Sequence, residues 1–214
     1  MEEKKEKYWS KFPESYDKNQ EYVAGRKLLG DISERLKNLS NLGEVVELGC
    51  GTGYFSDILS HNASQMISTD LSEELLSKAK TRLINRPNVT LQKENCIKTS
   101  FSSDRFDTVF MANLIHVIEH PIKALQESHR ILKADGLLII VTFTNHGMRK
   151  FDTIKMGIRF LRAWGKPPQH THSFSPESLG SLMESTGFSI NESGLLGTKT
   201  KAVFMIGQKE QQSA

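Results

Sequence analysis

Short apolar runs alternate with longer amphipathic segments along most of this chain. The runs are rich in β-branched and other apolar side chains, which is typical of buried strands. They are VVEL at 45–48, QMIST at 65–69, NVTLQ at 88–92, DTVFM at 107–111 and LLIIVTF at 137–143. Because helical spacing of apolar residues recurs between the runs, the pattern predicts a mostly parallel sheet with helices on both faces.

The sequence also marks where helices begin and end. Apolar residues recur at helical spacing over 21–39, which predicts one amphipathic helix before the first strand. Ser72 is a predicted N-cap ahead of an acidic first turn, and Pro121 is expected to open a helix that ends near residue 132. Ser175-Pro176-Glu177 predicts a further helix start.

Two more strands are expected at the end of the chain, one after Gly187-Phe188 and one at 201–208. The connection through Gly194 and Gly197 is too short for a crossover helix, so these strands should be antiparallel neighbours. The predicted fold class is α/β: a doubly wound, seven-stranded, mostly parallel sheet with an antiparallel last strand. An N-terminal helix precedes it, and a helical lid follows the fifth strand.

Composition narrows the class of protein only slightly. No apolar run approaches the roughly 20 residues of a membrane span. The charged N-terminus does not resemble a secretory signal, so we expect a cytoplasmic protein. Cys50 and Cys96 are expected to be reduced thiols, and no metal site is predicted. A net charge of +3 gives no reason to expect a nucleic-acid partner.

The most informative stretch is VVELGCGTGYFS at 45–56. Three glycines, Gly49, Gly51 and Gly53, turn a predicted strand into a helix, as glycine does where φ is positive or a ligand approaches the backbone. The dinucleotide fingerprint fails narrowly, because Tyr54 or Ser56 stands where its third small residue is required. A phosphate-binding P-loop is disfavoured because no lysine occurs over 45–77.

An acid follows the second predicted strand. Asp70 lies 17 residues beyond Gly53, where a carboxylate can accept hydrogen bonds from both hydroxyls of a ribose. The loop therefore suits an uncharged sugar with a zwitterionic tail better than it suits phosphates.

These residues resemble the class I S-adenosylmethionine-dependent methyltransferases, in particular the small-molecule type 11 group of ubiquinone and menaquinone biosynthesis. The resemblance extends through RFDTVFMANLIHVIEHP and ALQESHRILKADGLLIIV and covers about residues 43–143 strongly. It implies S-adenosyl-L-methionine as cofactor, S-adenosyl-L-homocysteine as product, and one domain over 1–214. The parts are an N-terminal helical cap (1–40), a cofactor-binding half (41–144), a lid (145–172) and a C-terminal helix and strand pair (173–209).

The resemblance also assigns site residues. The residues expected to bind the cofactor are Glu47, Gly49, Cys50, Gly51, Gly53, Asp70, Leu71, Asn95, Cys96, Asn113, Tyr16, Tyr22 and Arg26. Two positions depart from the family pattern. Asn95 replaces the usual aspartate near the adenine amino group, and Ala134-Asp135-Gly136 replaces Pro-Gly-Gly, with Gly136 expected to keep the positive φ.

The sequence leaves the acceptor open. Methyl transfer needs placement of the nucleophile and exclusion of water more than a catalytic triad. For a phenol or amine acceptor a base with a pKa near 7 would help, and His116 is the candidate, with plain pocket lining as the alternative role. The residues expected near a small-molecule acceptor are His116, His146, Trp164, His170 and His172.

The lid carries a strong charge. Residues 146–172 hold six basic residues and the single acid Asp152, a net +5. Met148, Phe151, Ile154, Ile158, Leu161 and Trp164 fall at helical spacing on one face. One interpretation packs this apolar face on the sheet edge under a solvated basic face. The other makes the helix a contact with an anionic membrane, or a basic mouth over an acidic or lipid-like substrate.

Several other functions remain open. The chain could bind S-adenosylmethionine without catalysis, or methylate a protein or RNA. No Asn-Pro-Pro-Tyr motif follows the fourth predicted strand, where Met111-Ala112-Asn113-Leu114 stands. Arsenite methylation would need three or more cysteines, and two are present. Either a monomer or a homodimer fits the sequence.

Overall fold

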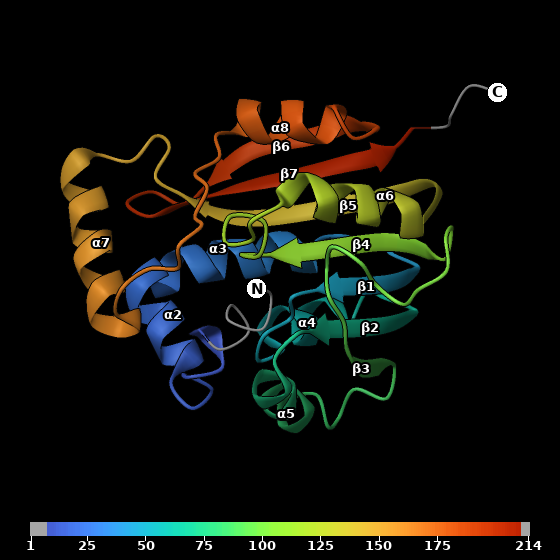
Figure 1. Cartoon of the computed structure of the whole chain (residues 1–214), viewed down its shortest axis with the longest axis horizontal. Helices are drawn as coiled ribbons and strands as arrows, with labels where there is room; N and C mark the ends of the chain where they lie inside the picture. The colour runs from blue at the N-terminus through green and yellow to red at the C-terminus, as the bar shows by residue number, and fades with distance from the viewer. Residues whose placement is uncertain (1–7, 211–214) are drawn as a thin grey trace.

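The structure is a computed structural model that describes residues 8–210. Its centre is a seven-stranded sheet with the order β3-β2-β1-β4-β5-β7-β6 (Figure 1). The strands are β1 (Glu44–Leu48), β2 (Gln65–Asp70), β3 (Val89–Lys93), β4 (Phe106–Ala112), β5 (Leu132–Thr144), β6 (Phe188–Leu196) and β7 (Lys201–Lys209). The strands from β1 to β5 are parallel, and β7 is antiparallel to both β5 and β6. The predicted fold class is confirmed.

Helices cover both faces of the sheet. Their bounds are α2 (Tyr16–Ala24), α3 (Arg26–Lys37), α4 (Tyr54–Leu59), α5 (Glu73–Arg82), α6 (Pro121–Ile131), α7 (Lys150–Trp164) and α8 (Pro176–Glu184). Successive residues of β4 enter opposite layers: Val109 joins α6 and α8 in one apolar cluster, and Phe110 joins α3 and α4 in the other. Burial on both faces explains why the strands read as nearly continuous apolar runs.

The predicted helix over 21–39 is wrong as a single element. Gly25 has φ 86° and ψ 144°, a conformation that only glycine adopts readily, and it separates α2 from α3. The apolar pattern did not reveal the break because both short helices keep a buried face.

The helix starts at Ser72, Pro121 and Ser175 are confirmed. Ser72 accepts a hydrogen bond from the Leu75 amide, and Ser175 forms a capping box with Ser178. The turn before β5 differs from the prediction, because the positive φ of 61° belongs to Asp135 and not to Gly136. Gly136 is required for space instead: a Cβ there would lie 2.9 Å from the Lys133 carbonyl oxygen.

The lid helix α7 does not pack on the sheet edge with its apolar face. It stands at one end of the molecule, beyond the carboxyl ends of the parallel strands, and packs against α2 (Figure 1). Trp164 is buried, but Phe151, Ile154, Ile158 and Leu161 are exposed. Within residues 8–210, no helix is long and apolar enough to cross a membrane.

Candidate active site

The glycine loop follows β1 and has the backbone that its sequence predicts. Gly49, Gly51 and Gly53 have φ values of 75°, 56° and 77°. A Cβ on Gly49 would lie 2.9 Å from a Leu114 methyl carbon, so a larger residue there would also have to displace the Leu114 side chain. The amide of Cys50 donates to the Thr69 carbonyl at 2.8 Å, which ties the loop to the end of β2.

Asp70 ends β2 and holds the loop from the other side. One of its carboxylate oxygens accepts a hydrogen bond from the Gly51 amide at 2.8 Å, and the other accepts from the Ser72 amide at 2.9 Å. These bonds fix the carboxylate at the wall of a large cavity. Since a carboxylate offers about four lone-pair sites, it can accept ligand hydroxyls in addition.

The large cavity has a volume of about 520 Å³ and lies at the carboxyl ends of the parallel strands, where Asp70, Ala112 and Asn113 line it. Strand ends and loops form one wall. The other wall is formed by residues 167–170 and by residues 8–24, called here the N-terminal segment, which includes α2. Its lining residues are Tyr8, Trp9, Tyr16, Gly49, Asp70, Leu71, Ser72, Leu75, Glu94, Cys96, Ala112, Asn113, Leu114, Val117, Ile118, Glu119, Pro167, Pro168, Gln169 and His170.

A smaller cavity behind the glycine loop contains the buried acid Glu47. Burial raises the pKa of Glu47 to about 7, although the Ser56 hydroxyl donates a hydrogen bond to its carboxylate. Cys50 also lines this cavity, and burial raises the pKa of its thiol, which makes it a weak nucleophile.

Asn113 lies where the two cavities meet, at the end of β4. It has a positive φ of 55°, and its Oδ1 accepts a hydrogen bond from the Phe143 amide at 3.2 Å. Its Nδ2 is buried without a hydrogen-bond partner among the described residues. A buried donor of this kind is costly unless a ligand supplies an acceptor.

The N-terminal segment is fixed over the glycine loop by polar contacts. The Thr52 hydroxyl donates to Asp17 at 2.6 Å, and Arg82 forms an ion pair with Asp17 while donating to the Thr52 carbonyl at 2.8 Å. Tyr16 belongs to the same segment and lines the large cavity. Its burial, reinforced by the charge of Asp70, raises the pKa of Tyr16 well above the usual value, so the phenol stays protonated.

Trp164 does not line either cavity. Its indole lies behind the wall in an aromatic cluster with Tyr8, Trp9, Phe12 and Tyr16, at ring-centroid distances of 5.1 Å from Trp9 and 5.2 Å from Tyr16. The predicted substrate contact is therefore replaced by a supporting position, because Trp9 and Tyr16 stand between Trp164 and the cavity.

His116 is not among the cavity-lining residues. Its Nδ1 lies 2.8 Å from the Thr142 hydroxyl, and burial lowers the pKa of His116 to about 4. The ring is neutral at pH 7 and is a poor proton acceptor there, which does not fit the expected base with a pKa near 7.

The other three histidines predicted near the acceptor lie in different surroundings. His170 lines the cavity, with its Nε2 3.9 Å from a carboxylate oxygen of Glu119. His172 has a structural position, because its Nε2 is 3.0 Å from the Ile118 carbonyl and its amide donates to the His116 carbonyl at 2.8 Å. His146 is exposed and lies outside the cavity.

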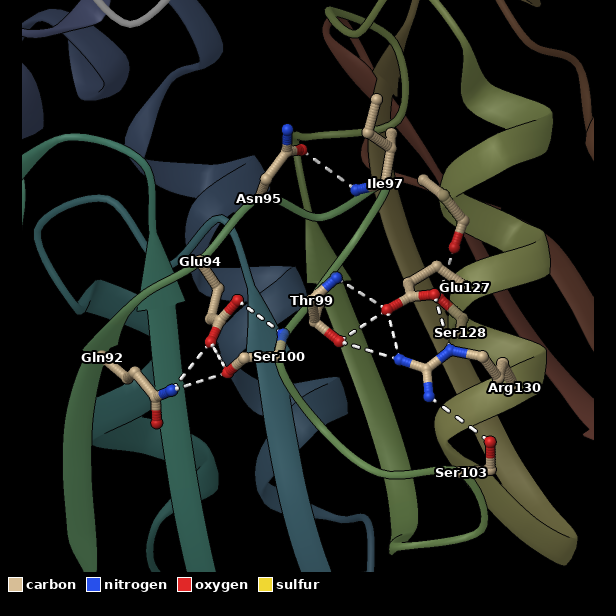
Figure 2. A network of polar contacts seen from close by, with 11 residues as sticks. Gln92, Glu94, Asn95, Ile97, Thr99, Ser100, Ser103, Glu127, Ser128 and Arg130 are labelled. Carbon is tan, nitrogen blue, oxygen red and sulfur yellow. Dashed lines mark hydrogen bonds and ion pairs between the residues drawn. The ribbon is translucent and has the colours of Figure 1, made fainter.

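Five predicted cofactor residues are not among those that line either cavity: Gly51, Gly53, Tyr22, Arg26 and Asn95. Tyr22 and Arg26 are exposed on α2 and at the start of α3. Asn95 is held in a turn, where its Oδ1 accepts a hydrogen bond from the Ile97 amide at 3.1 Å (Figure 2). The neighbouring Glu94 lines the cavity instead, and it accepts hydrogen bonds from the Gln92 side chain at 2.7 Å and the Ser100 amide at 2.9 Å.

Sequence reasoning missed part of the cavity wall. Tyr8, Trp9, Glu94, Glu119 and residues 167–169 line it without having been predicted. The aromatic spacing of Tyr8, Trp9 and Phe12 near the N-terminus was a usable signal, because such large rings are seldom left unpacked.

The doubly wound sheet, the glycine loop after β1 and the acid after β2 together define a methyltransferase-type domain. A family model described as a methyltransferase domain matches residues 16–193, most of the chain. The chain therefore belongs to this family, and the resemblance to class I methyltransferases is confirmed.

Curated relatives carry related names. The chain is 29% identical over 106 residues to a demethylmenaquinone methyltransferase of Bacteroides fragilis, covering 47% of the chain and 43% of that protein. It is 26% identical over 172 residues to a malonyl-[acyl-carrier protein] O-methyltransferase of Legionella pneumophila, covering 78% and 56%. The chain spans about half the length of the curated relatives it matches.

Solved structures share the fold at low identity. A methyltransferase from Thermotoga maritima, described as a possible histamine N-methyltransferase, aligns with a TM-score of 0.74 and 22% identity over 96% of the chain and all of that structure. The [4+2]-cyclase SpnF aligns with a TM-score of 0.66 and 14% identity over 85% of the chain and 80% of its own.

Proposed function

We propose that this protein transfers a methyl group from S-adenosyl-L-methionine to a small-molecule acceptor and releases S-adenosyl-L-homocysteine. The observation that carries the proposal is the cavity of about 520 Å³, which joins the glycine loop and Asp70 to an apolar compartment. Ligand sites of small molecules usually fall in the range of roughly 300–1,000 Å³, so this volume suits a cofactor with an acceptor beside it.

The residues present fit this cofactor. Asp70 would accept hydrogen bonds from the ribose hydroxyls, while Glu47 and the unpaired Nδ2 of Asn113 would face the ammonium and carboxylate groups of the methionine part. Leu71 and Cys96 would line the adenine side, with Glu94 taking the position expected of Asn95. When bound, the cofactor supplies a methyl group on a positively charged sulfur, which is already activated for displacement.

The acceptor would lie between Trp9, Val117, Ile118 and His170. The apolar side chains would bind a hydrophobic body and exclude water from the reacting atoms. His170, with Glu119 beside it, would accept the proton of a hydroxyl acceptor. This arrangement favours phenol- or quinol-like acceptors over thiolates, which need no base. The name of the demethylmenaquinone methyltransferase relative agrees with a quinol-like acceptor.

The test is turnover of S-adenosylmethionine labelled on its methyl group, with a panel of thiols, phenols, quinols and amines. We expect label to appear in a phenol or quinol product, and calorimetry to show binding of S-adenosylmethionine but not of NAD. Binding without turnover on any acceptor would favour the non-catalytic alternative. This distinction matters because a [4+2]-cyclase shares the fold.

A further inference from the structure

The lid helix α7 exposes the apolar face that a packed helix would bury. Phe151 is 74% exposed, Ile154 63%, Ile158 45% and Leu161 57%. These four residues, called here the apolar stripe, recur every three or four positions and so share one side of the helix. Trp164 follows Leu161 by three residues at the end of the helix, but it is only 6% exposed and packs on Trp9, while the helix also packs against α2.

The apolar stripe dominates the exposed hydrophobic surface. Seven large hydrophobic side chains are exposed among residues 8–210, and five of them are the stripe and Tyr22 on the adjacent α2. The ring of Tyr22 lies 5.8 Å from the Arg159 guanidinium, which connects the two helices at this surface. Clustered exposed apolar residues mark interaction sites, whereas scattered ones need no explanation.

Basic residues border the stripe. Lys155 and Arg162 are exposed next to it along the helix, and Arg149, Lys150 and Lys166 lie at its two ends. With Arg159 they give the segment its charge of six basic residues against Asp152 alone. An apolar stripe with basic borders has the chemistry of a helix that lies in the plane of a membrane interface.

We propose that α7 docks on an anionic lipid surface, with the apolar stripe at the acyl boundary and its basic border against the lipid phosphates. A second copy of the chain fits this surface poorly. Two-fold dimers bring the same patch of each subunit together, so two strongly basic borders would face each other. Lipid phosphates supply the opposite charge and an apolar layer at once.

The position of α7 gives this contact a consequence for the active site, which rests on the proposed function. The helix ends at Trp164, and three residues later the chain reaches the cavity wall at Pro167, Pro168 and His170. A docked α7 would hold this part of the cavity close to the membrane. An amphipathic acceptor could then reach the cavity without crossing bulk water.

The experiment is co-sedimentation of the full chain with vesicles of phosphatidylcholine, with and without phosphatidylglycerol. We expect binding only to vesicles that contain phosphatidylglycerol, and weaker binding at high salt. The variant Phe151→Ser/Ile154→Ser and the variant Arg159→Glu/Arg162→Glu should each lose at least about tenfold in affinity. Phe151, Ile154 and Arg162 are exposed, and Arg159 is half-buried beside the Tyr22 ring, so none of the four belongs to the core and circular dichroism should show folded proteins.

Matched controls separate this surface from general stickiness. Ile84→Ser/Ile122→Ser removes two hydrophobic side chains that are 78% and 47% exposed elsewhere, and Lys80→Glu/Lys123→Glu makes the same charge change on α5 and α6. Both controls should bind vesicles like the parent. Absence of binding by the parent, or equal losses in controls and α7 variants, would overturn the proposal. So would a dimer in sedimentation velocity that the Phe151→Ser/Ile154→Ser variant dissociates.

Failure of the membrane proposal and failure of the proposed function are distinguishable. S-adenosylmethionine affinity, measured by calorimetry without vesicles, should be the same in the parent and in all four double variants. A chain that binds the cofactor but no vesicles overturns the membrane contact alone.

Discussion

At the scale of single residues, Glu47 combines complete burial with a titration near neutral pH. Its pKa in the folded protein is about 7, against an ordinary value of 4.5. Between these two pH values the folded protein binds more protons at this site than the unfolded chain does. Stability from this group therefore falls as the pH rises through that window. Such a cost is expected where a charge is held for a ligand rather than for the fold.

We predict that Glu47→Gln makes the protein more stable at pH 8 than the parent, by on the order of 1–3 kcal/mol, and that the difference shrinks toward pH 5. Urea unfolding of both proteins at the two pH values measures it. The comparison between parent and variant cancels the opposite titration of His116, whose pKa is lowered. An equal difference at both pH values would show that the pKa of Glu47 is not raised in the folded protein. Cofactor affinity should fall in the same variant.

Asp70→Ala should weaken binding of S-adenosylmethionine by about 1.5–3 kcal/mol, the scale of lost charge-assisted hydrogen bonds. The loss should have two causes. The ribose hydroxyls lose their acceptor, and the loop loses the hydrogen bonds that the Gly51 and Ser72 amides donate to Asp70. Calorimetry gives the dissociation constant, and circular dichroism confirms folding. Asp31→Ala, which changes an acid on α3 that pairs only locally with Lys27, is the control. A folded Asp70→Ala protein with the parent's dissociation constant would remove Asp70 from the site.

At the scale of elements, two glycines in neighbouring positions should respond in opposite ways. Gly25 separates α2 from α3 with φ 86° and ψ 144°, while Gly30 lies inside α3 with open space around it. We predict that Gly25→Ala costs about 1–3 kcal/mol of stability and Gly30→Ala gains about 0.4–1 kcal/mol. Thermal or urea unfolding measures both. Two changes of the same sign would contradict the helix break at Gly25.

Elements were predictable where one local pattern sets the structure. The strands, the Ser72 and Ser175 caps and the glycine loop depend on periodicity or backbone preference within a few residues. The break at Gly25 was not predictable in this way, since a glycine inside an apolar helical pattern also occurs at Gly30. The positive φ at Asp135 shows the same limit, because Asp and Gly both tolerate that conformation.

The site was predictable only where it coincides with such local patterns. The glycine loop and Asp70 were predicted from spacing, and Gly49 and Asp70 line the large cavity. Trp164, His116 and Tyr22 lie outside the cavity linings, because their surroundings depend on tertiary packing: an aromatic cluster, the Thr142 contact and an exposed helix face. The exposed apolar stripe of α7 could not be foreseen either, since periodicity does not state which face a neighbour covers.

At the scale of the whole molecule, two segments that are distant in sequence pack together beside the cavity. The N-terminal segment and α7 meet through the aromatic cluster, and two hydrogen bonds run between them, from Tyr8 to the Trp164 carbonyl at 3.2 Å and from Asn19 to the Ala163 carbonyl at 3.0 Å. Tyr16 and Trp9 belong to this cluster and also line the cavity. The stability of this contact between the N-terminal segment and α7 should therefore be coupled to the affinity of the cavity for a ligand.

Replacing Trp164 tests this coupling. Trp164→Ala removes the central ring of the cluster. It should lower the free energy of unfolding by about 3–5 kcal/mol if the space left by the indole stays empty, and Trp164→Phe should lower it less. Because Trp9 and Tyr16 lose their support, we predict weaker binding of S-adenosylmethionine and faster amide hydrogen exchange in α2 and α7. Exchange in the central strands should stay slow, since their protection comes from the core of the sheet.

The control for this prediction is Leu161→Ala, one turn earlier on the exposed side of the same helix. It should leave both cofactor affinity and exchange in α2 unchanged, because Leu161 is 57% exposed and belongs to the apolar stripe. A Trp164→Ala protein with normal cofactor affinity but a raised Michaelis constant for the acceptor would contradict the supporting role. That result would mean that the indole contacts the acceptor directly, and that the N-terminal segment and α7 move far enough during turnover to bring Trp164 into the cavity.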